Sequence, residues 1–190
     1  MAKLESNLKT MVLSLFGVCA VASTLLAFMN QVTEGPIAES KLKAKLEAIQ
    51  LVVPEFTNNP SEEMYLIPSD LGDLECYPAR RDSQLVGVAI STRTNIAFSG
   101  SFALMVGFTP TGEIINTSVL EHKETPGLGT KMMEAKFKSQ FEGKNPGTNN
   151  LKVKKDGGEI DAITAATITS RAFSDAIVRA YKSWQEGGKK

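Results

Sequence analysis

The chain has 190 residues, 42% of them hydrophobic, and its 21 Lys and Arg residues balance its 21 Asp and Glu residues. This length suits one domain with an added anchor, and the balanced charge supplies no basic surface for nucleic acid. With one His and two cysteines, Cys19 and Cys76, the chain lacks the clustered ligands of zinc and iron–sulfur sites. A disulfide between these cysteines is not expected, because Cys19 lies in an apolar run. Redox chemistry would therefore need an organic cofactor.

An uncharged segment, residues 11–33, follows a short N-terminal stretch, residues 1–10. Its first nineteen residues would span roughly 28 Å as a helix, close to the thickness of the bilayer hydrocarbon. Lys3 and Lys9 precede the segment and Glu34 follows it, so the positive-inside rule predicts a single-pass helix with a cytoplasmic N-terminus. A cleaved signal peptide is the alternative. The long apolar core and the lack of a small-x-small cleavage site favour the uncleaved anchor.

Residues 34–83 have a mixed pattern that predicts a membrane-proximal helix and an irregular segment. Gly35-Pro36 would end the membrane span, and the apolar spacing of residues 37–51 predicts a separate short amphipathic helix. The rest is rich in turn residues, which favours irregular structure with short strands. Cys76 would be an inert, partly buried thiol.

Three apolar segments, residues 85–90, 102–108 and 114–120, are typical of strands. Thr109-Pro110-Thr111-Gly112 is a turn sequence, so the last two segments should form an antiparallel hairpin. The apolar pattern does not alternate strictly, which indicates that at least one strand is buried on both faces. We expect an α+β fold: a mainly antiparallel, twisted sheet with flanking helices and one N-terminal transmembrane helix.

The segment Glu124-Thr125-Pro126-Gly127-Leu128-Gly129 combines a proline with two glycines. The proline fixes one backbone angle, and the glycines permit conformations that other residues resist. One interpretation is a simple turn into a helix over residues 130–141. The other is a loop whose bare backbone approaches a flat ligand. Glycines alone favour the first interpretation.

Residues 161–170 hold four hydroxyl side chains just before an amphipathic helix. The helix stripe consists of Ile168, Ala172, Phe173, Ala176, Ile177, Ala180, Tyr181 and Trp184. Thr167 or a neighbour would then lie at the helix N-terminus, where unpaired N–H groups and the helix dipole suit a phosphate. Thr and Ser are also common helix caps, so these residues alone do not specify a ligand.

The two segments resemble the two signatures of the FMN-binding domain family. Residues 124–129 reproduce the first signature, and Asp161, Thr164, Ala166, Thr167 and Thr169 match the second, the flavinylation motif. Ala165 departs from the family pattern, which usually has Gly at that place. The resemblance implies that residues 84–185 form an FMN-binding domain, with residues 186–190 as a polar tail.

In the family, FMN is joined through its phosphate to the last threonine of the motif, which is Thr169 here. A separate flavin transferase, which uses FAD and a metal, makes this ester, and the resemblance implies that it recognises Asp161. The implied cofactor-binding residues, besides Thr169, are Glu124, Thr125, Pro126, Gly127, Leu128, Gly129, Lys131, Thr164, Ala165, Ala166, Thr167 and Ile168. We expect no catalytic side chain and no metal ligand of the chain's own.

Within the family, an N-terminal anchor on one compact domain resembles the G subunits of Rnf complexes, which couple electron transfer between ferredoxin and NAD to Na⁺ or H⁺ translocation. The resemblance implies an electron relay in the bacterial inner membrane, with its domain on the periplasmic side. Its partners would be other redox subunits, the flavin transferase and the lipid bilayer. The alternatives are a C subunit of a sodium-translocating NADH:quinone reductase, a membrane-anchored FMN sensor, and an assembly subunit without flavin.

Overall fold

The computed structural model describes residues 7–187; residues 1–6 of the expected N-terminus and 188–190 of the expected tail lie outside the described residues. The chain divides into two compact units, residues 1–43 and 44–190. The elements are α1 (Leu8–Val52), β1 (Tyr65–Ile67), β2 (Leu74–Arg81), β3 (Gln84–Ala97), β4 (Gly100–Phe108), β5 (Ile114–Glu121), the 3₁₀ helix η1 (Gly129–Met133), α2 (Ala135–Lys138), the 3₁₀ helix η2 (Lys154–Asp156) and α3 (Thr167–Gly187).

Helix α1 is continuous over 45 residues and contains Pro36. The short helix expected over residues 37–51 is therefore not separate, because it forms the C-terminal part of α1. A proline removes one backbone hydrogen bond from a helix. The helical segments on both sides of Pro36 are long, and the helix continues through it. Of the helices in residues 7–187, α1 alone is long and apolar enough to cross a membrane.

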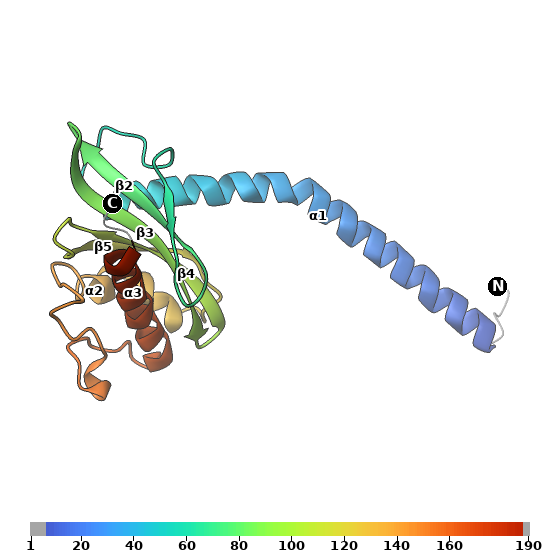
Figure 1. Ribbon diagram of the computed structural model, residues 1–190. Helices are drawn as coiled ribbons and strands as arrows, with labels where there is room; N and C mark the ends of the chain where they lie inside the picture. The colour runs from blue at the N-terminus through green and yellow to red at the C-terminus, as the bar shows by residue number, and fades with distance from the viewer. Residues whose placement is uncertain (1–6, 188–190) are drawn as a thin grey trace. The chain divides into compact units, whose positions relative to one another are not determined.

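The five strands form one antiparallel sheet in the order of the chain, β1-β2-β3-β4-β5 (Figure 1). The expected hairpin is confirmed: β4 pairs with β5, and the Gly112 N–H donates to the Thr109 carbonyl across the turn at 2.9 Å. Strand β2, with eight residues, is longer than the short strands expected in a mostly irregular segment. Strand β2 is extended because it pairs with β3 along its length. The sequence of β2 alone does not reveal this partner.

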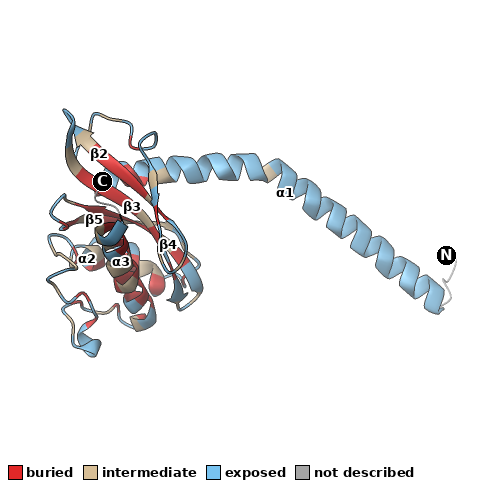
Figure 2. Cartoon of the chain, viewed as in Figure 1, coloured by how far each residue is buried: buried red, intermediate tan, exposed pale blue. Residues whose placement is uncertain are grey.

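The sheet is buried on both faces in its centre, as the apolar pattern predicted, most clearly in β4. One face, with Cys76, Val88 and Leu104, packs against α3. The other, with Ala89 and Met105, packs against the last turns of α1. Figure 2 shows this burial concentrated in the sheet and α3. Cys76 is fully rather than partly buried, and burial raises the pKa of its thiol to about 12.

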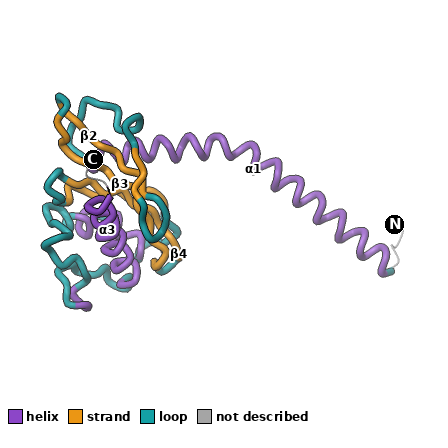
Figure 3. The backbone as a smooth tube through the Cα atoms, in the orientation of Figure 1, coloured by secondary structure: helices purple, strands orange, loops and turns teal. Residues whose placement is uncertain are grey.

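The chain between β5 and α3 is mostly loop, with short helical turns (Figure 3). The single helix predicted over residues 130–141 is wrong. Its place is taken by η1 and α2, separated at Glu134, whose backbone is extended at φ −71° and ψ 142°. Packing sets this arrangement, because the Phe137 and Phe141 rings each lie 5.2 Å from that of Phe173 in α3.

Helix α3 begins at Thr167, as predicted, and lies against the sheet (Figure 1). Most of the predicted stripe is buried. Ile168 is 47% exposed and Tyr181 is only half-buried, whereas Ser174, which is not part of the predicted stripe, is buried.

Candidate functional site

The two sequence motifs, about forty residues apart in the chain, meet in one cavity of about 310 Å³. Its lining residues are Phe98, Glu124, Thr125, Leu128, Gly129, Ala165, Ala166, Thr167, Ile168 and Thr169. Four of them belong to the first motif and five to the second, so the cavity is the space between the motifs. Only Phe98 belongs to neither.

Thr169 has a buried hydroxyl, and its Oγ1 atom has no hydrogen-bond partner among the described residues. Leaving a buried hydroxyl unpaired costs about 1–3 kcal/mol. Thr117 and Ser174 share this feature, but neither lines the cavity. Thr169 is therefore distinguished by an unpaired buried hydroxyl at the cavity wall, within the first turn of a 21-residue helix.

The fully buried side chain of Ser170 stabilises the turn before α3 through two hydrogen bonds. The Ile163 N–H donates to Ser170 Oγ at 2.9 Å, and that hydroxyl donates to the Ala166 carbonyl at 3.0 Å. Between these two attachments, Ala165 takes the left-handed conformation, with φ +61°. This is the position where the resembled family usually has glycine, and the backbone conformation explains that preference.

The facing loop is shaped around Glu124, which is buried. The Ser99 N–H donates to Glu124 Oε1 at 3.3 Å. A Cβ atom on Gly129 would lie 2.3 Å from Glu124 Oε2, so this contact requires glycine. Gly127 has a positive φ of +74°, a backbone conformation that favours glycine. Its N–H donates a hydrogen bond to Thr130 Oγ1. Of the two glycines, Gly129 borders the cavity and Gly127 does not.

Apolar side chains form the rim of the cavity. Phe98, Leu128 and Ile168 are 68%, 41% and 47% exposed. Removing apolar surface from water is favourable. A flat apolar group that covered these side chains would therefore bind favourably in the cavity.

Not every predicted site residue borders this cavity. Thr164, Lys131 and Asp161 line a second cavity of about 320 Å³. Asp161 forms an ion pair with Lys154 at 2.8 Å. Pro126 and Gly127 line neither of the two cavities. The flavinylation motif is therefore divided, with its first residues at one cavity and its last five at the other.

Four residues with a structural part in the site were not predicted from the sequence: Phe98, Ser99, Gln140 and Ser170. Phe98 lies within the predicted FMN-binding domain, residues 84–185, which was the one signal available. Ser99 and Gln140 act through hydrogen bonds to residues more than twenty positions away in the chain. Ser170 acts through two bonds within its own turn, and none of these contacts leaves a pattern in the sequence.

The start of α3 is also tied to η2 by charge. Arg171 donates two hydrogen bonds to the Asp156 carboxylate, both at 2.7 Å. These bonds hold the pKa of Asp156 below its ordinary value. Both side chains are solvent-exposed, so the pair orients the loop more than it stabilises the fold.

Comparison with known proteins agrees with this geometry. The model of the FMN-binding domain family matches residues 98–182. The chain is 34% identical to the G subunit of an ion-translocating oxidoreductase complex from Stutzerimonas stutzeri, covering 88% of this chain and 77% of the relative. It is 37% identical to the protein of the same name from Salmonella typhi, covering 85% and 84%.

A third relative is the G subunit of the Na(+)-translocating ferredoxin:NAD(+) oxidoreductase complex of Acetobacterium woodii, 32% identical over 91% of this chain and 89% of the relative. Among solved structures, the C subunit of the Na(+)-translocating NADH-quinone reductase from Parabacteroides distasonis aligns with a TM-score of 0.49 and 18% identity, covering 63% of this chain and 65% of that one. The chain belongs to the family formed by the G subunits of ion-translocating oxidoreductase complexes, and its FMN-binding domain contains both motifs.

Proposed function

We propose that the chain is a membrane-anchored electron-transfer subunit that carries FMN, joined through its phosphate to Thr169. It would act in an Rnf-type complex that couples electron transfer between ferredoxin and NAD to the translocation of Na⁺ or H⁺. The activity in the name of the Acetobacterium woodii relative supports this choice. When bound, flavin supplies one- and two-electron transfer, so the protein is a relay within a translocase rather than a separate catalyst.

One observation carries the proposal: Thr169 has an unpaired, buried hydroxyl in the cavity where the two motifs meet. The lining residues fit the two ends of FMN. The first turn of α3 offers backbone N–H groups and the positive end of the helix dipole to a phosphate. The apolar rim, formed by Phe98, Leu128 and Ile168, would suit the ring system.

A threonine hydroxyl is a weak nucleophile, so attachment needs a separate flavin transferase. In the proposed step, Thr169 Oγ1 forms a bond to the FMN-side phosphorus of FAD. The diphosphate P–O bond breaks, AMP leaves, and the hydroxyl proton passes to solvent. No electrons are gained or lost in this transfer. A covalent bond also prevents cofactor loss outside the cytoplasm, where the FMN pool of the cytoplasm could not replace it.

The same proposal assigns roles to the segments. Residues 11–33 would span the membrane, residues 1–10 would be cytoplasmic, and the FMN-binding domain, residues 84–185, would lie on the periplasmic side. Residues 44–83 belong to the same compact unit as that domain, since β2 pairs with β3.

Thr169→Val tests the attachment site, because valine keeps the shape of threonine and removes an unpaired hydroxyl. We expect complete loss of covalent flavin without loss of stability, measured by in-gel flavin fluorescence and by intact mass. Ser174→Ala is the matched control, since it also removes a buried, unpaired hydroxyl from α3 but lies away from the cavity. Flavin retained on Thr169→Val would refute the attachment site.

Co-purification distinguishes the relay from its alternatives. The relay predicts that the chain purifies with other membrane redox subunits. Isolation alone or with a kinase would favour an FMN sensor, and a colourless chain produced together with a flavin transferase would favour an assembly role without flavin. The three relatives described above are G subunits, which favours the Rnf-type complex over a place as the C subunit of the quinone reductase.

A further inference from the structure

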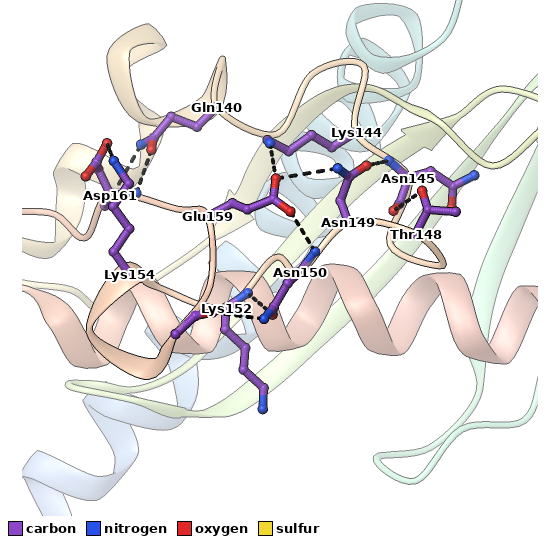
Figure 4. A network of polar contacts seen from close by, with 11 residues as sticks. Gln140, Lys144, Asn145, Thr148, Asn149, Asn150, Lys152, Lys154, Glu159 and Asp161 are labelled. Atoms are coloured by element: carbon purple, nitrogen blue, oxygen red, sulfur yellow. Dashed lines mark hydrogen bonds and ion pairs between the residues drawn. The ribbon is translucent and has the colours of Figure 1, made fainter.

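Gln140 joins the segment after α2 to the first residue of the flavinylation motif. Its Oε1 accepts a hydrogen bond from the Asp161 N–H at 2.7 Å, and its Nε2 donates to the Asp161 carbonyl at 3.3 Å. Figure 4 shows the two side by side, with Lys154 on the Asp161 carboxylate. The amide of one side chain thus satisfies both backbone groups of Asp161, as a neighbouring strand would.

The position of Gln140 is itself fixed by the core. Phe137 and Phe141 stand on either side of it in the chain, and both are buried. Their rings lie 5.4 Å apart, and each is 5.2 Å from Phe173 in α3. Gln140 therefore holds Asp161 at a defined place relative to the helix that contains Thr169.

The motif is also held at its other end, where Ser170 binds the backbone of Ile163 and Ala166. The residues just before the motif are held separately. Glu159 accepts hydrogen bonds from Lys144, Asn149 and the Asn150 N–H (Figure 4). Among these contacts, the two bonds from Gln140 are the ones that act on Asp161's own backbone.

The side chain of Asp161, by contrast, is available. It is 67% exposed, and its partner Lys154 is 60% exposed. A surface ion pair of this kind contributes little to stability, and its carboxylate exchanges easily to another partner. The backbone is thus fixed while the carboxylate remains accessible to another protein.

We propose that Gln140 is a positioning residue for the modification of Thr169: it holds the Asp161 backbone so that the carboxylate is presented to the flavin transferase. This inference rests on the proposed function, because it concerns how the FMN site is made. Gln140 does not line the cavity that contains Thr169.

The test uses the full-length, flavin-free chain, purified flavin transferase, FAD and Mg²⁺. Gln140→Met keeps the side-chain length and removes both hydrogen bonds, whereas Gln140→Glu keeps the acceptor for the Asp161 N–H. We expect the initial rate of flavin attachment, as kcat/KM for the chain, to fall about tenfold in Gln140→Met, chiefly through KM. Gln140→Glu should recover to within about threefold of wild type.

Lys154→Ala is the control for the exposed ion pair, and we expect its kcat/KM to change less than about twofold. Hydrogen exchange of the Asp161 amide, measured on the flavin-free chain, reports the Gln140 contact without any attachment. It should be faster in Gln140→Met and near wild type in Gln140→Glu.

Equal attachment rates in wild type and Gln140→Met, with faster amide exchange in the variant, would overturn this inference and leave the proposed function standing. Equal loss in Gln140→Met and Gln140→Glu would also overturn it, since a merely structural role would not be rescued by the acceptor. A wild-type chain that accepts no flavin would overturn both proposals.

Discussion

At the scale of single residues, Ala165 has a backbone conformation that its side chain disfavours. Its φ of +61° lies in the left-handed region, where a non-glycine residue costs about 1–2 kcal/mol. Ala165 is exposed, so the cost comes from its own backbone rather than from crowding. Ser170 binds the backbone on both sides of Ala165, at Ile163 and Ala166, and keeps this conformation in place.

Ala165→Gly should therefore stabilise the folded domain by about 0.5–1 kcal/mol, since relief of the left-handed strain exceeds the added entropy of the unfolded chain. The measurement is the urea midpoint of the flavin-free chain in detergent, with an unchanged slope. Ala166→Gly is the matched control: the neighbouring residue is buried and has no positive φ, so glycine there should destabilise. Destabilisation of similar size in both variants would contradict this account.

At the scale of elements, the last turn of α1 packs directly on the backbone of β4. A Cβ atom on Gly107 would lie 1.7 Å from the Val52 carbonyl oxygen, a contact that no side chain can occupy. The absence of a side chain thus lets the helix end rest on the sheet. This explains why residues 44–52 belong to the compact unit that contains the site.

Gly107→Ala should lower the free energy of unfolding by about 3 kcal/mol or more, because helix and strand must separate to admit the methyl group. Thermal unfolding of the detergent-solubilised chain measures this loss. Gly87→Ala offers a milder comparison, since its nearest contacts would be 3.2–3.3 Å and small shifts would relieve them. If the two variants lost the same stability, the close helix–strand contact would not be the cause.

At the scale of the whole molecule, residues 8–43 expose many large apolar side chains. The most apolar eighteen-residue window of α1 has no buried residue in the structure. Leu13 and Leu26 are 75% and 72% exposed. This exposed apolar surface supports the proposal that residues 11–33 span the membrane.

The charge asymmetry predicts that protease added to spheroplasts digests the domain after residue 44, whereas protection of the domain would reverse the topology. Intact mass of the membrane-extracted chain separates an anchor from a signal peptide. The anchor retains residues 1–33, and a mature chain that lacks them would contradict it.

The accuracy of sequence-based prediction varied between segments for identifiable reasons. The hairpin 102–120 and the start of α3 at Thr167 were predicted correctly, because turn residues and helical periodicity are local signals. The extent of β2 was missed because it depends on pairing with β3. The helix over 130–141 was wrong because Phe137 and Phe141 pack on Phe173, and no local pattern encodes that contact.

The sequence by itself determined the chemistry available to this protein: an uncharged span, two motifs in order, and hydroxyl groups at the start of an amphipathic helix. These features follow from residue types and short spacings. The tertiary structure decided that the two motifs face one cavity, that Ala165 has a positive φ, and that Gln140 holds Asp161. Each of these depends on packing between segments far apart in the chain, which the folded core fixes and local sequence does not.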